Sequence, residues 1–463
     1  MNPGPRQLTL DEWDARYGEL KRAGLREPPY GGPLSRHVED GDFRLLKLRF
    51  DDSAAALRLW NFLLTEEDRL AAARAAGRKI VGAMKDLGTV PVLAYSLPNV
   101  TAFYPDGAWW IPCVMELSAG VFRAAETFGL DESFCPVRAM LGAFVTQAHF
   151  PIPDLLICSV GATCDDFSAI AQRLNGLGHP ILWWEIPHRR APDPGEPAVT
   201  LPGGFVAPAG QVAFVRGEME RIRAALESLA GEPLDEERLA AGIRVANQAR
   251  RQLAELRRAV YHADVCPLPA LEMLIAEMLI IHFCSDREET LAVYADLLDE
   301  VRRRTQAEAG VAPREAVRVF WVNPVADLQV MNLLEDCGAR LCGTEYLFCH
   351  ALDEIPEDLP PLEALARMAL ADPMVGPSTD RAARIVRDAR EGRAEAAIVS
   401  RIPGASHCAF EGAVFKDALQ DQLGIPVLEI EVPPVSDSLT PTLRTRIEAL
   451  LEAARQGRPR RKA

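Results

Sequence analysis

Three cysteines of this chain stand in short loops at the ends of predicted core elements. Cys135 lies in "DESFCPVRAMLG" between helical stretches, Cys164 follows the apolar run "DLLICSV", and Cys408 follows the apolar run "AAIVS". Loops at the carboxyl ends of parallel strands converge at one edge of a sheet, so thiolates that are distant in sequence can meet there. Thiolates hold iron–sulfur clusters, and the fold can bring them together without clustered spacing along the chain. A small core residue is the alternative interpretation for each cysteine, because a reduced thiol packs as a small hydrophobe.

The other cysteines are weaker candidates for ligands. Four of them lie in apolar runs or in the helical middle of the chain, where a thiol packs in the core. These four are Cys158, Cys266, Cys284 and Cys342. Cys337 and Cys349 flank the strand candidate in "GARLCGTEYLF", where core packing is favoured over a place in a site. Cys113, after "DGAWWIP", is the first candidate for a substitute ligand.

A short basic segment offers a second kind of chemistry. "LWWEIPHRR" places His188, Arg189 and Arg190 just beyond a predicted strand end. Guanidinium groups bind phosphate through paired hydrogen bonds, so this segment can hold a phosphate-bearing ligand such as a coenzyme A tail. His407, beside Cys408, can tune or protonate a group in the site. A plain solvated loop and a surface histidine are the alternative interpretations of these residues.

Several common signatures are missing from the sequence. It contains no GxGxxG after the first predicted strand, no GxxxxGK[ST], no GxSxG and no HExxH. A nucleotide-binding or serine-hydrolase function therefore has no direct support. CxxC is missing too, which disfavours a zinc ribbon or a thioredoxin-type redox pair. No side chain is identified as catalytic from these patterns.

Composition restricts the partners and the compartment. The formal net charge of −15 disfavours nucleic acid as the main partner, because phosphate binding needs a basic face. The sequence lacks an apolar run long enough to cross a membrane, and its N-terminus is polar, so we expect a cytoplasmic protein with no membrane partner. Ten cysteines at irregular spacing predict reduced thiols or metal ligands rather than a disulfide framework.

The elements that must position these residues alternate between short apolar runs and helical stretches. The runs "VPVLAYSL", "DLLICSV" and "PILWWEI" predict strands of a first lobe, and "RVFWVN", "RLCGT", "AAIVS" and "PVLEIEV" predict strands of a second. Such alternation is typical of βαβ units around a parallel sheet. Residues 212–305 repeat apolar positions at helical spacing, which predicts packed helices. The predicted fold class is α/β, with two Rossmann-like parallel-sheet lobes joined by a helical segment.

This pattern divides the chain into four predicted ranges. Residues 1–80 form an N-terminal helical and loop extension, which we expect to be an appendage or an interface arm. Residues 81–205 form the first α/β lobe, residues 206–312 the helical connecting segment, and residues 313–463 the second α/β lobe. Residues 191–210 are rich in proline and glycine and are expected to be irregular surface chain.

Four stretches, in this order, carry a family resemblance. They are "AAETFGLDESFCPVRAMLGAF", "PDLLICSVGATCDDF", "LLEDCGARLCGTEYLFCHALDE" and the closing block from "ASHCAFEGAVF" to "TRIEALLE". With them the chain resembles the 2-hydroxyacyl-CoA dehydratase D-component family, which also contains the benzoyl-CoA reductase subunits. The resemblance runs from about Val90 to the C-terminus. The first, second and last stretches are similar to the family's three cysteine segments.

The resemblance implies a cofactor, a reaction and partners. The family's cluster-ligating cysteines correspond to Cys135, Cys164 and Cys408, which implies a 4Fe-4S cluster held by three thiolates between two α/β lobes. One iron left open implies catalysis rather than scaffolding. The implied reaction is one-electron reduction of an acyl- or aryl-coenzyme A thioester at low potential. The implied partners are a related family subunit in a heterodimer and a separate ATP-hydrolysing iron–sulfur activator.

Two other functions remain open. The first is a cluster-free structural or partner-binding subunit of such a complex, which is favoured by the charged N-terminus and by "SLPNVTAF", a segment that departs from the family pattern. The second is a self-sufficient double-cluster reductase of small molecules, which would need further ligands such as Cys113 or Cys349. Asp165 and Asp166 would be repelled by an anionic cluster, so we expect them to face solvent, a helix N-terminus or a partner subunit.

Overall fold

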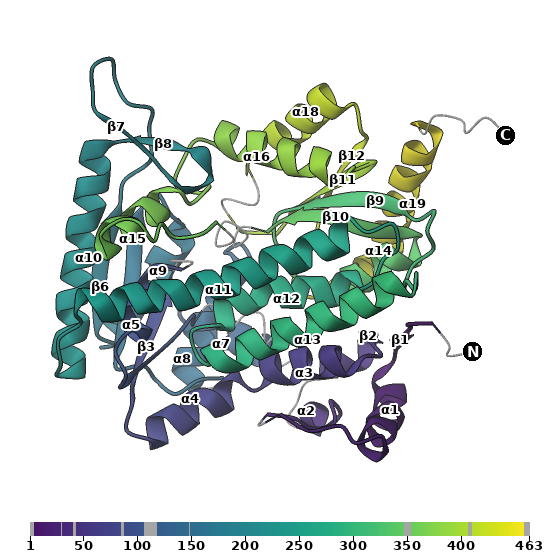
Figure 1. The fold of residues 1–463 in the computed structure, drawn as a ribbon, viewed down its shortest axis with the longest axis horizontal. Coiled ribbons are helices and arrows are strands. Elements are labelled where there is room, and N and C mark those ends of the chain that lie inside the picture. The colour runs from purple at the N-terminus through teal and green to yellow at the C-terminus, as the bar shows by residue number, and fades with distance from the viewer. Residues whose placement is uncertain are drawn as a thin grey trace.

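The computed structural model describes residues 4–28, 30–39, 43–84, 88–105, 118–147, 149–346, 353–405 and 410–457. These residues form two four-stranded parallel sheets with helices around them and long helices between them (Figure 1). The architecture confirms the predicted α/β fold class with two Rossmann-like lobes.

The first sheet is parallel and has the strand order β4-β3-β5-β6. Its strands are β3 (Lys79–Met84), β4 (Val100–Phe103), β5 (Leu155–Gly161) and β6 (Ile181–Ile186). The central strands β3 and β5 are apolar and buried through most of their length, as expected for a parallel sheet that is covered on both faces. The helices that follow these strands are α5 (Val90–Tyr95), α7 (Ser118–Glu126), α8 (Ala139–Thr146) and α9 (Asp165–Gly176).

One predicted strand of the first lobe is wrong. "VPVLAYSL" forms helix α5 and the two residues after it, not a strand. The edge position of the sheet belongs to β4, and β3 lies inside it. The proline at position 91 stands in the first turn of α5, where its fixed φ fits and its missing N–H breaks no helical hydrogen bond. Every residue of α5 is buried, and its sequence is apolar throughout. Without alternating polar positions, the sequence shows neither the period of a helix nor that of a strand.

The second sheet repeats the topology of the first. It is parallel, and its strand order is β10-β9-β11-β12, so both sheets have the order 2-1-3-4 when their strands are counted along the chain. The strands are β9 (Val317–Val322), β10 (Ala339–Glu345), β11 (Ala396–Arg401) and β12 (Val427–Glu431), all close to their predicted positions. The helices of this lobe are α14 (Gln329–Asp336), α15 (Pro361–Leu370), α16 (Ser378–Glu391), α18 (Gly412–Leu423) and α19 (Thr440–Gly457).

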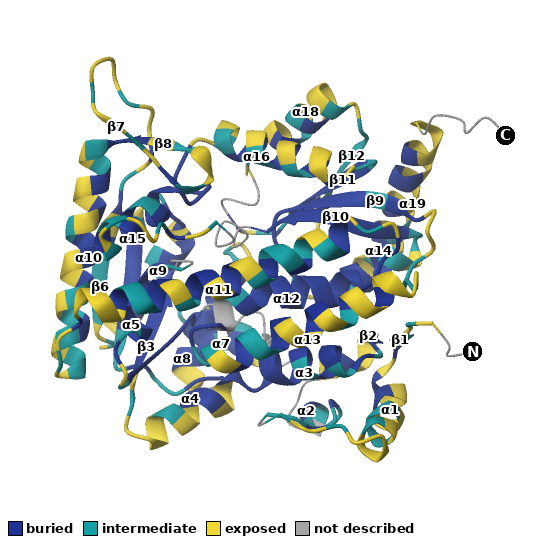
Figure 2. Ribbon diagram, viewed as in Figure 1, coloured by how far each residue is buried: buried dark blue, intermediate teal, exposed yellow. Residues whose placement is uncertain are grey.

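Four long helices occupy the segment between the two lobes along the chain, as predicted. They are α10 (Ala209–Ala230), α11 (Glu236–Tyr261), α12 (Ala270–His282) and α13 (Arg287–Gln306). Helix α11 contacts α5 of the first lobe and β10 of the second, and it crosses the middle of the molecule in Figure 1. Helix α12 is buried from Ala270 to Leu279, and Figure 2 shows it dark blue like β9 and β10. No described helix has both the length and the apolar character needed to cross a bilayer.

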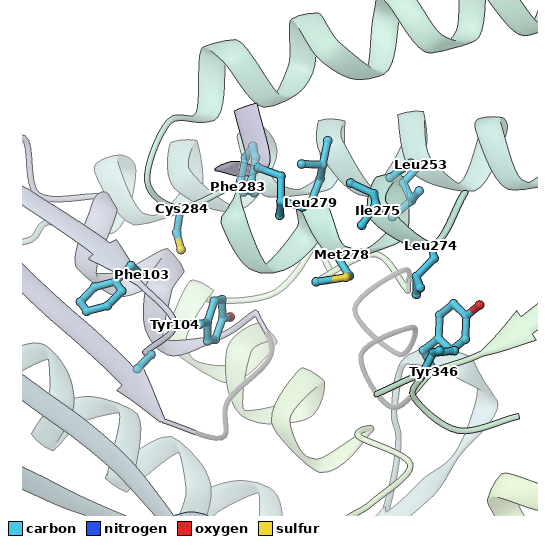
Figure 3. Packing of buried hydrophobic residues seen from close by; sticks show 14 of the residues in the cluster. Phe103, Tyr104, Leu253, Leu274, Ile275, Met278, Leu279, Phe283, Cys284 and Tyr346 are labelled. Carbon is cyan, nitrogen blue, oxygen red and sulfur yellow. The ribbon is translucent and has the colours of Figure 1, made fainter. Parts of the chain in front are cut away.

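Apolar side chains of α12 pack between the two lobes. Figure 3 shows Met278 and Leu274 of this helix between two tyrosines, one from each lobe. Tyr104 is the first residue after β4 and is 3% exposed, and Tyr346 is the first residue after β10 and is fully buried. In both lobes, therefore, the residue that follows the second strand is buried against the same helix. One apolar core runs through the molecule.

The N-terminal part of the chain is more integrated than the expected appendage or arm. Its elements are β1 (Gln7–Leu8), α1 (Leu10–Arg22), α2 (Arg36–Glu39), η1 (Phe43–Lys47), β2 (Phe50–Asp51), α3 (Ala54–Leu64) and α4 (Glu66–Ala75). Helix α3 packs on α12 and α13, and Trp60 is fully buried. Arg304 of α13 binds both carboxylate oxygens of Asp51, at 2.5 and 2.9 Å, which ties β2 to the central helices. The four predicted ranges stay a prediction.

The proline- and glycine-rich stretch contains a short hairpin in place of the irregular chain that we expected. Strands β7 (Ala198–Thr200) and β8 (Val206–Pro208) pair in antiparallel register. Gly203 and Gly204 lie in the turn between them with φ of 74° and 83°, a backbone region that favours glycine. These strands are too short, and too closely surrounded by turn residues, for the sequence to show an alternation of apolar and polar residues.

Candidate functional site

Cys164 lies at the carboxyl edge of the first sheet, as the strand-end reasoning predicted. It follows the end of β5 and is the N-cap residue of α9, with its side chain 8% exposed. Its Sγ lies 3.6 Å from Oδ2 of Asp166. The positive end of a helix dipole favours a thiolate over a thiol, so this position suits a sulfur ligand.

The two aspartates after Cys164 occupy the first turn of α9. A helix N-terminus was one of the surroundings that we expected for these carboxylates, and the structure confirms it. Asp165 is exposed, whereas Asp166 is buried and contacts the Cys164 thiol. Only one of the two carboxylates therefore borders the sulfur.

Cys158, on β5 itself, is a core residue as predicted. Its side chain is fully buried, and burial raises the pKa of its thiol to about 12, with a smaller contribution from Cys164. Nearby, the hydroxyls of Ser159 and Thr163 lie 3.2 Å apart. The edge of the first sheet thus carries hydroxyl groups, the Cys158 thiol and one buried carboxylate, that of Asp166, close to Cys164.

Cys135 also stands at the start of a helical segment. It is the N-cap residue of η2 (Pro136–Arg138), which runs directly into α8, and it is partly buried. The proline after Cys135 holds it in an extended conformation and starts the helical turn. Arg138 fixes this loop by donating from Nη1 to the Phe134 carbonyl at 2.7 Å. Because η2 packs against α9, the helical segments that begin at Cys135 and Cys164 are neighbours.

The loop after β11 of the second lobe reaches the Cys135 loop. Gly404 has φ of 77°, and a methyl group in place of its hydrogen would stand 2.6 Å from the Phe134 carbonyl carbon. Only glycine permits so close a backbone approach in this conformation. The loop that leads toward Cys408 therefore lies on the residue that precedes Cys135. Cys408, His407, Cys113 and Cys349 themselves lie outside the described residues.

A charged network, which we did not predict, closes the carboxyl edge of the second sheet. Its centre is Arg381 of α16, which binds Glu345 at the end of β10 and Glu411 at the start of α18. Asn323, the residue after β9, is the third partner of this guanidinium and accepts a hydrogen bond from it at 2.6 Å. The sequence contains one signal for this network, a glutamate that ends an apolar strand. A carboxylate is rarely buried without a partner, so this residue indicates a buried cation nearby.

The basic segment after β6 already has partners within the chain. Arg189 is 1% exposed, donates to Asp380 at 3.0 Å and to the Leu370 carbonyl at 2.6 Å, and so links the first lobe to the helices of the second. Arg190 donates to both carboxylate oxygens of Glu196, at 2.7 and 2.8 Å. The His188 carbonyl accepts from Gln211. Phosphate binding by this segment stays a prediction.

Segments that carry cysteines, or lead toward one, come together at this site. Two described cysteines begin neighbouring helical segments, and the second-lobe loop that precedes the third cysteine contacts the first. Within the described ranges, no three His, Cys, Asp or Glu side chains are grouped closely enough to hold a metal ion. The proposed third ligand falls in the gap between residues 405 and 410 of those ranges.

Comparison with known proteins agrees with this arrangement. No curated protein matches the chain. A comparison with family models matches residues 100–453 to the family described as 2-hydroxyglutaryl-CoA dehydratase, D-component. The match covers most of the chain, including the described cysteine loops and both edges. The chain therefore belongs to the 2-hydroxyglutaryl-CoA dehydratase D-component family.

Proposed function

We propose that this chain is the iron–sulfur subunit of a 2-hydroxyacyl-CoA dehydratase or benzoyl-CoA reductase-like system. Cys135, Cys164 and Cys408 would hold a 4Fe-4S cluster between the lobes. The observation that carries the proposal is the contact of Gly404 with the Phe134 backbone, together with the packing of η2 on α9. These contacts bring loops from three distant parts of the sequence to one place.

The cluster would supply one-electron reduction of an acyl- or aryl-coenzyme A thioester. The chain would contribute three thiolates, two of them at helix starts that favour negative charge, and would leave one iron open. Buried side chains on both sides, such as Tyr104 and Tyr346, would exclude water from this region. We propose a related family subunit as the partner and a separate ATP-hydrolysing iron–sulfur activator as the electron donor.

The test is the iron content of the full chain after anaerobic purification. We expect a brown protein with about four irons per chain. Cys164→Ala should lose that iron, because it removes a ligand at the start of α9. Cys158→Ala is the matched control, since it removes a thiol that is buried in the preceding strand, and it should keep the iron. Colourless wild-type protein that folds normally would refute the proposal.

A cluster-free subunit is the second candidate, and one observation favours it. The Asp166 carboxylate lies 3.6 Å from Cys164 Sγ, where it would repel an anionic cluster. Under this alternative Cys164→Ala and wild type would both lack iron and would bind the partner chain equally well. A content well above four irons per chain would instead favour a double-cluster reductase.

A further inference from the structure

The ends of three strands in the second sheet are joined by one residue. Asn323 follows β9 with φ of 72°, a conformation that non-glycine residues rarely adopt. Its backbone N–H donates to the Glu345 carbonyl of β10, and its Nδ2 donates to the Ser400 carbonyl of β11, both at 2.8 Å. The carboxyl ends of β9, β10 and β11 are therefore held in fixed positions.

Arg381 connects this strand edge to the start of α18. It is fully buried and binds both carboxylate oxygens of Glu345, at 2.9 and 2.6 Å. It also donates to Asn323 Oδ1 at 2.6 Å. Its remaining terminal nitrogen donates to Glu411 Oε2 at 2.6 Å. Glu411 is the N-cap residue of α18, so one guanidinium spans from two strand ends to the first turn of this helix.

The network is not required merely to attach α18 to the sheet. Apolar residues already do so, since Phe415 and Leu419 of α18 pack with Ile385 and Val386 of α16 in a separate buried cluster. The ion pair between the network and α18 is made at Glu411, at the start of the helix. The Arg381 guanidinium lies 4.6 Å from the ring centroid of Phe415, the next turn of the helix. Because apolar packing already attaches α18 to its neighbours, we expect the buried ion pairs to fix the geometry at the start of this helix.

The first turn of α18 is the part of the helix nearest in sequence to Cys408. Glu411 follows Cys408 by three residues. On the other side of Cys408, Gly404 is fixed against the Phe134 carbonyl. Both flanks of the segment that carries Cys408 are thus anchored, one on the Cys135 loop and one on Arg381.

We infer that Arg381 is a positioning residue for the proposed cluster, acting through Glu411 to hold the flank of Cys408 at the carboxyl edge of the second sheet. The inference rests on the proposed function, because it assigns Cys408 as a ligand. Groups that orient metal ligands are typically worth about 10- to 100-fold in metal affinity.

The test compares variants of the full chain that are reconstituted anaerobically with ferrous iron and sulfide. Glu411→Gln removes the carboxylate that α18 offers but leaves the Arg381–Glu345 pair intact. We expect about 10- to 100-fold faster loss of iron to a chelator, with an unfolding temperature of the iron-free protein close to that of wild type. Arg381→Lys, which keeps the charge but cannot span three partners, should show the same acceleration.

Arg384→Gln is the matched control. Arg384 lies three residues further along α16 and pairs with Asp353 at 2.7 Å, whereas Glu411 pairs with Arg381. It should lose some stability and keep its iron as wild type does. If Glu411→Gln and Arg381→Lys release iron at the wild-type rate, the inference is wrong while the proposed function stands. If wild type takes up no iron, the proposed function fails and the inference fails with it.

Discussion

Each lobe has the strand order 2-1-3-4, and in each a buried tyrosine follows the second strand, Tyr104 after β4 and Tyr346 after β10. Each also has a cysteine that follows its third strand in the sequence, Cys164 after β5 and Cys408 after β11. The side chains that fix the two edges differ. At the first edge, Cys164 lies beside a hydroxyl pair and the Asp166 carboxylate, whereas a buried guanidinium with two carboxylates holds the second edge next to the Cys408 segment.

Because of this difference, we expect the two lobes to hold their sheet edges with different rigidity, although their folds are similar. The hydrogen bond between Ser159 and Thr163 at the first edge is neutral, and a bond of this kind contributes about 1 kcal/mol, so this pair can adjust at small cost. Removing one partner of a buried ion pair strongly destabilises the protein. We therefore expect the paired arrangement of the second edge to be strongly favoured over any other. We expect the second lobe to act as the fixed frame against which the first lobe presents Cys135 and Cys164.

The largest expected effect is that of removing the guanidinium from the second edge. Arg381→Met leaves Glu345 and Asn323 buried without their cationic partner, and should cost about 3–5 kcal/mol in the free energy of unfolding. Urea unfolding of the iron-free chain measures this loss. Arg384→Met, on the same helix, should cost less, because its partner Asp353 is 22% exposed whereas Glu345 is 6% exposed. Equal losses for the two variants would contradict the special role of this edge.

The joint between the second lobe and the central helices should respond to pH. Burial, with a smaller effect of Asp51, raises the pKa of Glu272 to about 8, and burial raises the pKa of Glu335 in α14 to about 7. Between about pH 4.5 and these values the unfolded chain binds fewer protons than the folded one, so stability falls as pH rises. At the first edge, the buried Cys158 thiol titrates only near pH 12 and adds nothing in this range.

Glu272→Gln tests this prediction. The amide oxygen can still accept from the Asp51 backbone N–H and from Trp60 Nε1, which bind Glu272 Oε1 at 2.9 and 3.1 Å. The variant should match wild type near pH 5 and exceed its stability at pH 8, at about 1.4 kcal/mol per unit of pKa difference. Chemical unfolding across this range provides the measurement. Parallel curves for the two proteins would contradict the assignment.

The contact between the lobes should be broken by one methyl group. Gly404→Ala combines a left-handed φ with a clash against Phe134, and the backbone conformation alone costs about 1–2 kcal/mol. Gly161→Ala is the matched control, because its φ is 99° and its methyl group would clash with the Ile186 carbonyl inside the first sheet. Only Gly404→Ala should speed amide hydrogen exchange in residues 133–138. Similar exchange in both variants would contradict the contact between the Gly404 and Cys135 loops.

Sequence reasoning reached the features that depend on local pattern. Cys164 was found because an apolar run of strand length ends just before it, and α9 then begins at the next residue. Helix α5 was missed because a short apolar run has no periodicity to read, and its proline was the better signal. The Arg381 network and the Asp51–Arg304 pair could not be predicted, since their partners lie 30 to 253 residues apart and only the fold joins them.

The smallest effect is expected at the first edge and tests its tolerance. Ser159→Ala removes a hydroxyl that lies 3.2 Å from Thr163 Oγ1, a neutral hydrogen bond worth about 0.5–1.5 kcal/mol. The variant should unfold at only slightly lower urea concentration than wild type, and reconstituted protein should keep its iron. Thr163→Val, alone and combined with Ser159→Ala, completes a double-mutant cycle that isolates the pair. A coupling energy as large as the loss in Arg381→Met would mean that both edges are equally rigid, and the contrast between the lobes would then lie only in their charge.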